Sequence, residues 1–244
     1  MNEPIRIFIG TSSNGEDAEC EMVYEYSIRK NASVPVEITW MRQTHDGSSP
    51  WGGWQTQSWS TPFSGFRWVI PEVCGFKGRA IYTDCDMINF KDINDLINID
   101  LGGRPVAARR GSRFGGHEFC VMVFDCEAFE QYSMPINRMK AIPESHHRMI
   151  NKFSGQPLVQ DLNPKWNCLD GDDVPVDELW HVHYTNMATQ PWRPAWFTGQ
   201  IAAHRRPDIF NLWFDMKDEA IDSGYSVDDY SPEEDFGPYN IIGR

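Results

Sequence analysis

The chain has 244 residues, of which 41% are hydrophobic and 13% aromatic, enough for one sizeable α/β domain or two small ones. Its formal net charge of -13 argues against a nucleic-acid backbone or an anionic membrane as the main partner, because either would repel it. No apolar run approaches the length of a membrane span, and the N-terminal Met-Asn-Glu-Pro lacks the features of a signal peptide. The six cysteines form no Cys-x-x-Cys pair, so we expect reduced core thiols and a cytoplasmic protein.

The first forty residues predict the opening of an α/β fold. Residues 5–9 indicate a short β-branched strand and residues 10–15 a loop of small hydrogen-bonding residues. Residues 16–31 indicate a helix with acidic first turns and a basic end, and residues 34–41 a second strand. A nucleotide-binding α/β fold begins in this order, but so can any other α/β protein.

The next stretch is polar and rich in glycine and tryptophan. Residues 45–62 predict a long surface loop whose tryptophans either cover a ligand or pack locally. Residues 63–74 predict a helix that contains Arg67. This arginine could reach a phosphate, although a surface position is the default for its type.

The segment 79–92 carries the strongest chemical signal. An apolar strand leads directly into Asp84 and Asp86, and apolar residues resume at Met87. Alternate side chains of an extended segment point the same way, so the two carboxylates can converge on one divalent cation. The alternative is a capped strand end, in which aspartate accepts backbone N–H bonds. A second pair, Asp170 and Asp172, lies in a glycine-containing loop that we interpret as a solvated turn.

Strand and helix patterns alternate through the middle of the chain. Helices are predicted over 92–101, 128–132 and 144–153, and strands over 105–109 and 119–124.

The stretch 180–184 alternates, so His181 and His183 are expected on one side of a strand. There a neutral imidazole could complete a metal site, or the two residues could be a packed histidine pair. From residue 215 on, acidic and small residues dominate. We therefore expect one domain over 1–215 and a loosely held acidic tail over 216–244.

Taken in order, these motifs resemble the retaining glycosyltransferases of family 8, the glycogenin-like group. The resemblance rests on the opening strand and loop with residues 27–29, and on residues 66–68, 78–87, 121–125, 183–184 and 191–192. It implies a GT-A fold: a single α/β domain with a Rossmann-like mixed sheet flanked by helices. It also implies a retaining transferase that moves a hexose from a nucleotide diphosphosugar, typically a UDP-sugar, to a hydroxyl acceptor such as a glycan. The implied cation is Mn²⁺, or Mg²⁺ in its place.

The resemblance assigns roles to individual positions. Three residues would hold the cation: Asp84, Asp86 and His183. Residues near the nucleotide or its phosphates would be Gly10, Thr11, Ser12, Arg67, Asp84, Cys85, Gln190 and Arg193. Gln190 stands where that family has a lysine, and Arg193 could replace the lost phosphate contact. On the sugar side, the candidate catalytic residues are Glu118, His146 and His147, the two histidines in place of an Asp-Gln pair.

Two other functions stay open from the sequence. The departures at Gln190, His146 and His147 also suit a sugar-nucleotide-binding protein without catalytic activity. A metal-dependent nucleotidyltransferase or phosphohydrolase would use the same pair of carboxylates, but would release pyrophosphate or phosphate instead of UDP.

Overall fold

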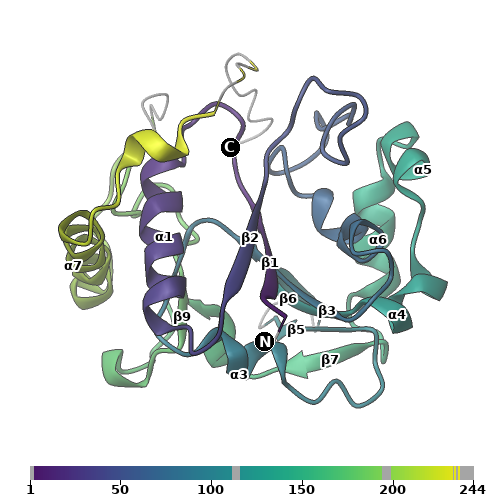
Figure 1. Ribbon diagram of the computed structural model, residues 1–244. Helices are drawn as coiled ribbons and strands as arrows, with labels where there is room; N and C mark the ends of the chain where they lie inside the picture. The colour runs from purple at the N-terminus through teal and green to yellow at the C-terminus, as the bar shows by residue number, and fades with distance from the viewer. Residues whose placement is uncertain (1–2, 112–115, 194–198, 233, 235, 237–244) are drawn as a thin grey trace.

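A computed structural model describes residues 3–111, 116–193, 199–232, 234 and 236 of the chain (Figure 1). Its centre is a mixed six-stranded sheet in the order β2-β1-β3-β6-β5-β7. The strands are β1 (Ile5–Gly10), β2 (Val36–Met41), β3 (Arg79–Asp84), β5 (Val106–Arg110), β6 (His117–Asp125) and β7 (Val159–Leu162). Strand β6 runs antiparallel to β3 and β5, whereas β1 pairs in parallel with β2 and β3, and β5 in parallel with β7. The predicted mixed sheet flanked by helices is confirmed.

Helices cover both faces of this sheet, which is why its central strands are apolar on both sides. Ile7 and Ile9 of β1 pack on one face with α1 (Ala18–Asn31) and α3 (Ile93–Ile97). Phe8 points to the other face. The elements on that face are the 3₁₀ helix η1 (Phe66–Val69) and the helices α2 (Ile70–Val73), α4 (Cys126–Phe129), α5 (Ile136–Ala141) and α6 (Ser145–Phe153). Short 3₁₀ turns lie at η2 (Glu130–Tyr132), η3 (Pro164–Asn167) and η4 (Val176–Glu178).

A smaller three-stranded sheet lies beside the large one. Its strands are β4 (Met87–Asn89), β9 (His181–His183) and β8 (Cys168–Leu169), in the order β4-β9-β8. The extended segment expected around Asp84 and Asp86 therefore divides into two strands. Strand β3 belongs to the large sheet and β4 to the small one, so Cys85 and Asp86 form the connection between the sheets.

The expectation of a loosely held tail from residue 216 is wrong for its described part. Helix α7 (Pro207–Asp222) continues through this position, and its apolar residues recur at helical spacing: Ile209, Trp213, Met216 and Ala220. They pack against α1, while the acidic residues occupy the exposed side of the helix. The 3₁₀ helix η5 (Val227–Tyr230) also contacts α1, because the Tyr230 hydroxyl donates to Glu25 over 3.1 Å. Residues 237–244 lie outside the described part.

The tryptophans of the loop 45–62 are expected either to cover a ligand or to pack locally, and two of them pack locally. Trp54 and Trp59 are buried, and their ring centroids lie 5.3 and 5.9 Å from that of Phe66. They fix the loop against η1. Among the helices that the structure describes, none is long and apolar enough to cross a membrane.

Candidate active site

Three predicted ligands meet where the two sheets join. Asp84 ends β3, Asp86 follows two residues later, and His183 ends β9. Because β4 runs antiparallel to β9, Met87 lies opposite His183, and the Tyr184 amide donates to the Asp86 carbonyl over 2.9 Å. His183 Nε2 lies 3.2 Å from Asp86 Oδ1. The imidazole thus faces the acidic pair although about one hundred residues separate them along the chain.

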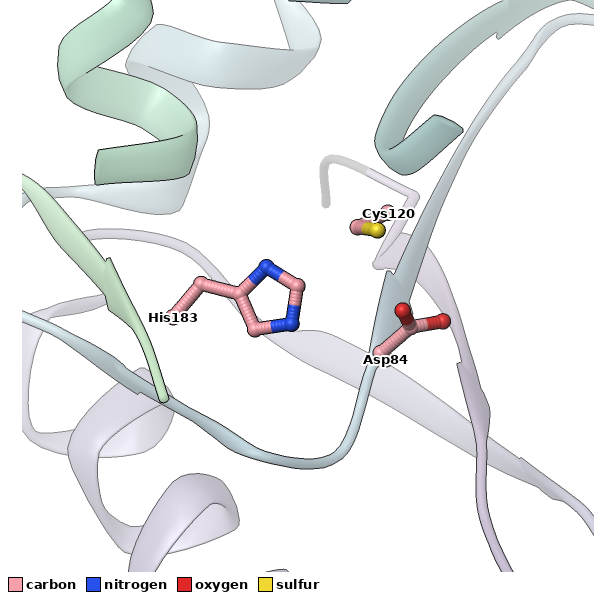
Figure 2. A group of neighbouring side chains, drawn as sticks. All are labelled: Asp84, Cys120 and His183. Atoms are coloured by element: carbon pink, nitrogen blue, oxygen red, sulfur yellow. The ribbon is translucent and has the colours of Figure 1, made fainter. Parts of the chain in front are cut away.

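A thiol from a third strand, β6, joins this group. Figure 2 shows His183 pointing toward Asp84, with the Cys120 sulfur beside both. One ligand atom from each of these three residues lies within 4.8 Å of the other two. Sequence reasoning missed Cys120, because it reaches Asp84 only through the antiparallel pairing of β3 with β6.

Arg67 is buried beside Asp84 and is not a surface arginine. Its Nη2 lies 3.2 Å from Asp84 Oδ1, which also accepts a hydrogen bond from the Tyr82 hydroxyl. The guanidinium lies 4.4 Å from the centroid of the Tyr82 ring, and its Nε donates to the Ser64 carbonyl over 2.9 Å. Arg67 therefore balances the charge of Asp84 and orients its carboxylate.

The donor atoms fit a hard divalent cation. Asp86 Oδ1 is buried, and no hydrogen bond of good geometry reaches it from the described residues. A buried carboxylate oxygen that lacks a hydrogen bond of good geometry is unfavourable unless a cation completes it. Carboxylate oxygens with one imidazole suit Mn²⁺ or Mg²⁺. Burial alone would lower the pKa of His183, but the Asp86 carboxylate outweighs this and raises the pKa above its usual value.

Asn167 fixes the orientation of the His183 ring. Its side-chain oxygen lies 3.1 Å from His183 Nδ1, and Arg109 Nη1 donates to its backbone carbonyl over 2.5 Å. An amide oxygen only accepts, so Nδ1 carries a hydrogen and Nε2 is the nitrogen that faces the acidic pair. The sequence predicts only a turn over 163–167, and no signal in it identifies Asn167 as a partner of His183.

A cavity of about 490 Å³ opens onto these groups. Eight of the predicted site residues line it: Ser12, Arg67, Asp84, Cys85, Asp86, His146, His183 and Gln190. We call Asp84, Asp86 and His183 the cation end. We call Phe119, His146 and Ile150 the α6 end, where the cavity reaches helix α6.

The loop after β1 borders the cavity near the cation end. Ser12 Oγ is buried without a hydrogen-bond partner among the described residues, so a ligand can use it. The Ser12 amide donates to Asp17 Oδ2 over 3.1 Å. Burial, and next the Asp86 charge, raise the pKa of Asp17 to about 6. Asp17 also lines the cavity, and sequence reasoning read it only as part of an acidic first helical turn.

Three predicted nucleotide-side residues do not line this cavity. Gly10 lies beneath it: its carbonyl accepts from the Cys85 amide over 3.1 Å, and an added Cβ would lie 2.5 Å from the Phe63 ring. Thr11 turns away, because its hydroxyl donates to Glu21. Arg193 folds back on its own turn, with Nη1 donating to the Trp192 carbonyl over 2.7 Å.

Two of the three predicted catalytic residues also lie outside the lining. Glu118 pairs with Arg109, its cross-strand neighbour on β5, with Oε2 3.6 Å from Nε, and does not line the cavity. His147 is exposed on α6. His146, one residue earlier on the helix, points inward and lines the cavity.

His146 is held as a neutral ring. The Trp68 indole donates to its Nδ1 over 3.0 Å, so the ring hydrogen sits on Nε2. Burial, with smaller effects from Arg67 and His147, lowers the pKa of His146 to about 3. At neutral pH this residue is therefore a hydrogen-bond donor through Nε2, and it cannot supply an acidic proton.

Two expectations about neighbouring residues need correction. His181 does not join His183 at the cation end, because it is buried and stacks on Tyr24 with ring centroids 5.4 Å apart. Asp170 is not in a solvated turn. It is buried, its Oδ2 lies 3.1 Å from His204 Nε2, and its Oδ1 accepts from the Thr185 hydroxyl over 3.0 Å.

The sequence matches one curated protein over part of its length. Over 99 residues the chain is 34% identical to Protein CDI of Arabidopsis thaliana, a match that covers 40% of this chain and 37% of that protein. No family model matches the chain.

Solved structures resemble it over most of its length. The bifunctional glycosyltransferase WbbM has a TM-score of 0.60 at 12% identity, covering 91% of this chain and 52% of its own. The glycosyltransferase GlyE of Streptococcus pneumoniae TIGR4 has a TM-score of 0.59 at 16% identity, with 91% and 64% covered. The galactosyltransferase LgtC, solved with donor and acceptor sugar analogues, has a TM-score of 0.59 at 12% identity, with 88% and 96% covered. The chain therefore has the GT-A glycosyltransferase fold.

Proposed function

We propose that the protein is a metal-dependent retaining glycosyltransferase. It moves a hexose from a nucleotide diphosphosugar, a UDP-sugar in the first instance, to a hydroxyl group of an acceptor such as a glycan. The observation that carries this proposal is the meeting of Asp84, Asp86 and His183 in one cavity of a GT-A fold. The glycosyltransferase names of the structural neighbours support the same reading.

The cation end holds Mn²⁺ or Mg²⁺ through Asp84, Asp86 and His183. When bound, such a cation neutralises the charge that develops on a departing diphosphate. Arg67 holds the Asp84 carboxylate in place, and Asn167 holds the His183 ring. Ser12 and Gln190 offer neutral polar groups to the nucleotide side of the donor.

The α6 end receives the sugar. The bond between the anomeric carbon and the phosphate oxygen breaks, and the acceptor oxygen bonds to the same face of that carbon. The leaving phosphate oxygen takes the acceptor proton, so the reaction needs no strong protein base. His146 donates a hydrogen bond from Nε2 to a sugar oxygen, and its neutral state makes it a positioning group. Glu118 and His147 have no part in this proposal.

The test is UDP release from a panel of UDP-sugars by the purified chain, with Mn²⁺ or with EDTA. Release that requires Mn²⁺ supports the proposal, and the anomeric configuration of the product, read by NMR, reports retention. Thermal shifts with UDP and Mn²⁺ but no turnover would instead identify a non-catalytic binder. Release of phosphate or pyrophosphate would identify the hydrolase or nucleotidyltransferase alternative. Donor hydrolysis that is unchanged in both Asp84→Asn and Asp86→Asn would overturn the assignment of the cation end.

A further inference from the structure

We propose that Asp84, Cys120 and His183 form a site for a thiophilic divalent cation of the Zn²⁺ class. This site shares Asp84 and His183 with the cation end but uses the Cys120 sulfur where the proposed Mn²⁺ site uses Asp86. Zinc would therefore compete with Mn²⁺ and block turnover. Only this last consequence rests on the proposed transferase function, because zinc binding itself is a property of the three side chains.

The geometry supports a three-ligand zinc site. One oxygen, one sulfur and one nitrogen, each from a different strand, lie within 4.8 Å of one another (Figure 2). In a tetrahedral zinc site, bonds of about 2.0 Å to N or O and about 2.3 Å to S place neighbouring ligand atoms roughly 3.3–3.8 Å apart. The three atoms therefore have to approach one another by at most about 1.5 Å, a shift of the size that side-chain rotation provides.

The identity of the ligands sets the preference between cations. A sulfur and an imidazole suit zinc, whereas Mn²⁺ and Mg²⁺ prefer the oxygen of Asp86 to a thiol. Asn167 presents His183 Nε2 to either cation, because it holds the ring hydrogen on Nδ1. Arg67 opposes both cations, since it contacts Asp84, the carboxylate that the two sites share.

Binding must remove the proton of Cys120. A free thiol is protonated near neutral pH, so the metal-free protein carries Cys–SH at this position. A thiol that coordinates a metal ion is deprotonated. The step is Cys–SH plus Zn²⁺ giving a zinc thiolate plus one H⁺, and the proton passes to the buffer. Proton release is therefore a direct signature of the sulfur ligand.

Calorimetry on the metal-free protein tests the proposal. ZnCl₂ is titrated into the wild type and into Cys120→Ser, in two buffers of different ionisation enthalpy. We expect Cys120→Ser to weaken zinc binding by a factor on the order of 100 and to release about one proton fewer, while Mn²⁺ affinity changes by less than about threefold. Cys74→Ser is the matched control, because that thiol is half-buried next to α2, outside the cavity.

Cobalt provides a second readout that needs no variant. Co²⁺ in the wild-type site should show the ultraviolet sulfur-to-cobalt charge-transfer band, and Cys120→Ser should lose it. Equal zinc affinity and proton release in wild type and variant, or no such band in the wild type, would overturn the proposal. These readouts stand even if the protein transfers no sugar. If it does, zinc should inhibit Mn²⁺-dependent turnover less in Cys120→Ser than in wild type.

Discussion

The cation end and the α6 end of the cavity are built in different ways. At the cation end, backbone hydrogen bonds fix the positions of the ligand residues. The Cys85 amide donates to the Gly10 carbonyl over 3.1 Å, and the Tyr184 amide donates to the Asp86 carbonyl over 2.9 Å. At the α6 end a side chain on a nine-residue helix is positioned mainly by another side chain, because Trp68 holds His146. Backbone pairing survives a change of side chain, so the chemistry of the cation end depends on few residue types. The α6 end depends on one ring and its tautomer.

The largest effect should come from removing a carboxylate at the cation end. We expect Asp86→Asn to lower Mn²⁺-dependent turnover on the order of 100- to 1,000-fold, because a catalytic cation supplies several kcal/mol of charge stabilisation. The fold should persist, because the backbone bonds around Asp86 do not use its side chain. UDP release measures the first effect and thermal unfolding the second.

Asp95→Asn is the matched control, since Asp95 is a half-exposed acid on α3 that pairs with Lys91 outside the cavity. Its turnover should equal that of the wild type. A Tm change in Asp86→Asn of more than about 4 °C, which is about 1 kcal/mol for a chain of this size, would show that the side chain is structural.

The second prediction concerns Asn167, which should act only through His183. We expect Asn167→Ala to weaken Mn²⁺ binding about 10- to 100-fold, as loss of the group that orients a ligand histidine usually does. In a His183→Ala background the same change should have no further effect, because no ring remains to be oriented. Calorimetric Mn²⁺ titration of the four proteins gives the coupling energy. In addition, long-range ¹H–¹⁵N correlation of the metal-free protein should show the Nδ1–H tautomer of His183 in the wild type and its loss in Asn167→Ala.

The same contrast explains which parts of the site the sequence could reveal. Asp84 and Asp86 are identified locally, because an apolar run delivers them at a strand end. His183 is identified by the alternation of its own strand and by the resemblance to family 8. Cys120 and Asn167 escape, because each is close to the site only through long-range strand pairing or a turn, which no local pattern encodes.

The fold was predictable where periodicity was strong and uniform. The opening strand, helix and second strand lie close to their predicted bounds. Helix α7 was missed because its many acidic residues suggested a solvated tail, although Ile209, Trp213 and Met216 keep helical spacing. The net charge of an amphipathic helix depends mainly on the residues of its exposed side. The spacing of its apolar residues indicates whether the helix packs against the rest of the protein.

The third prediction uses the protonation of His146. Its pKa is about 3 in the folded protein, against a usual value near 6.5, so only the unfolded chain binds this proton between these pH values. Stability therefore falls as pH falls from 6.5 toward 3, by about 1.4 kcal/mol per pH unit from this group. In His146→Phe that contribution is absent.

Urea unfolding at pH 7.5 and pH 5.0 measures this difference. Between these values the wild type should lose about 2 kcal/mol more stability than His146→Phe. Loss of the acceptor for Trp68 lowers the stability of the variant at both pH values alike, so it cancels in the comparison. Equal pH dependence in the two proteins would mean that His146 is accessible to water and free to charge.

The smallest effect should come from Glu118, which sequence reasoning placed beside the sugar. Its carboxylate instead faces Arg109, which also contacts Asp172 over 2.7 Å. Glu118→Gln should change turnover by less than about threefold, and stability by about 1–3 kcal/mol because Arg109 is buried and loses one of its two charged partners. A large loss of turnover in Glu118→Gln, with the KM for the donor unchanged, would mean that the Glu118 side chain reaches the sugar. Glu118 would then have to be added to the residues that bind the sugar at the α6 end.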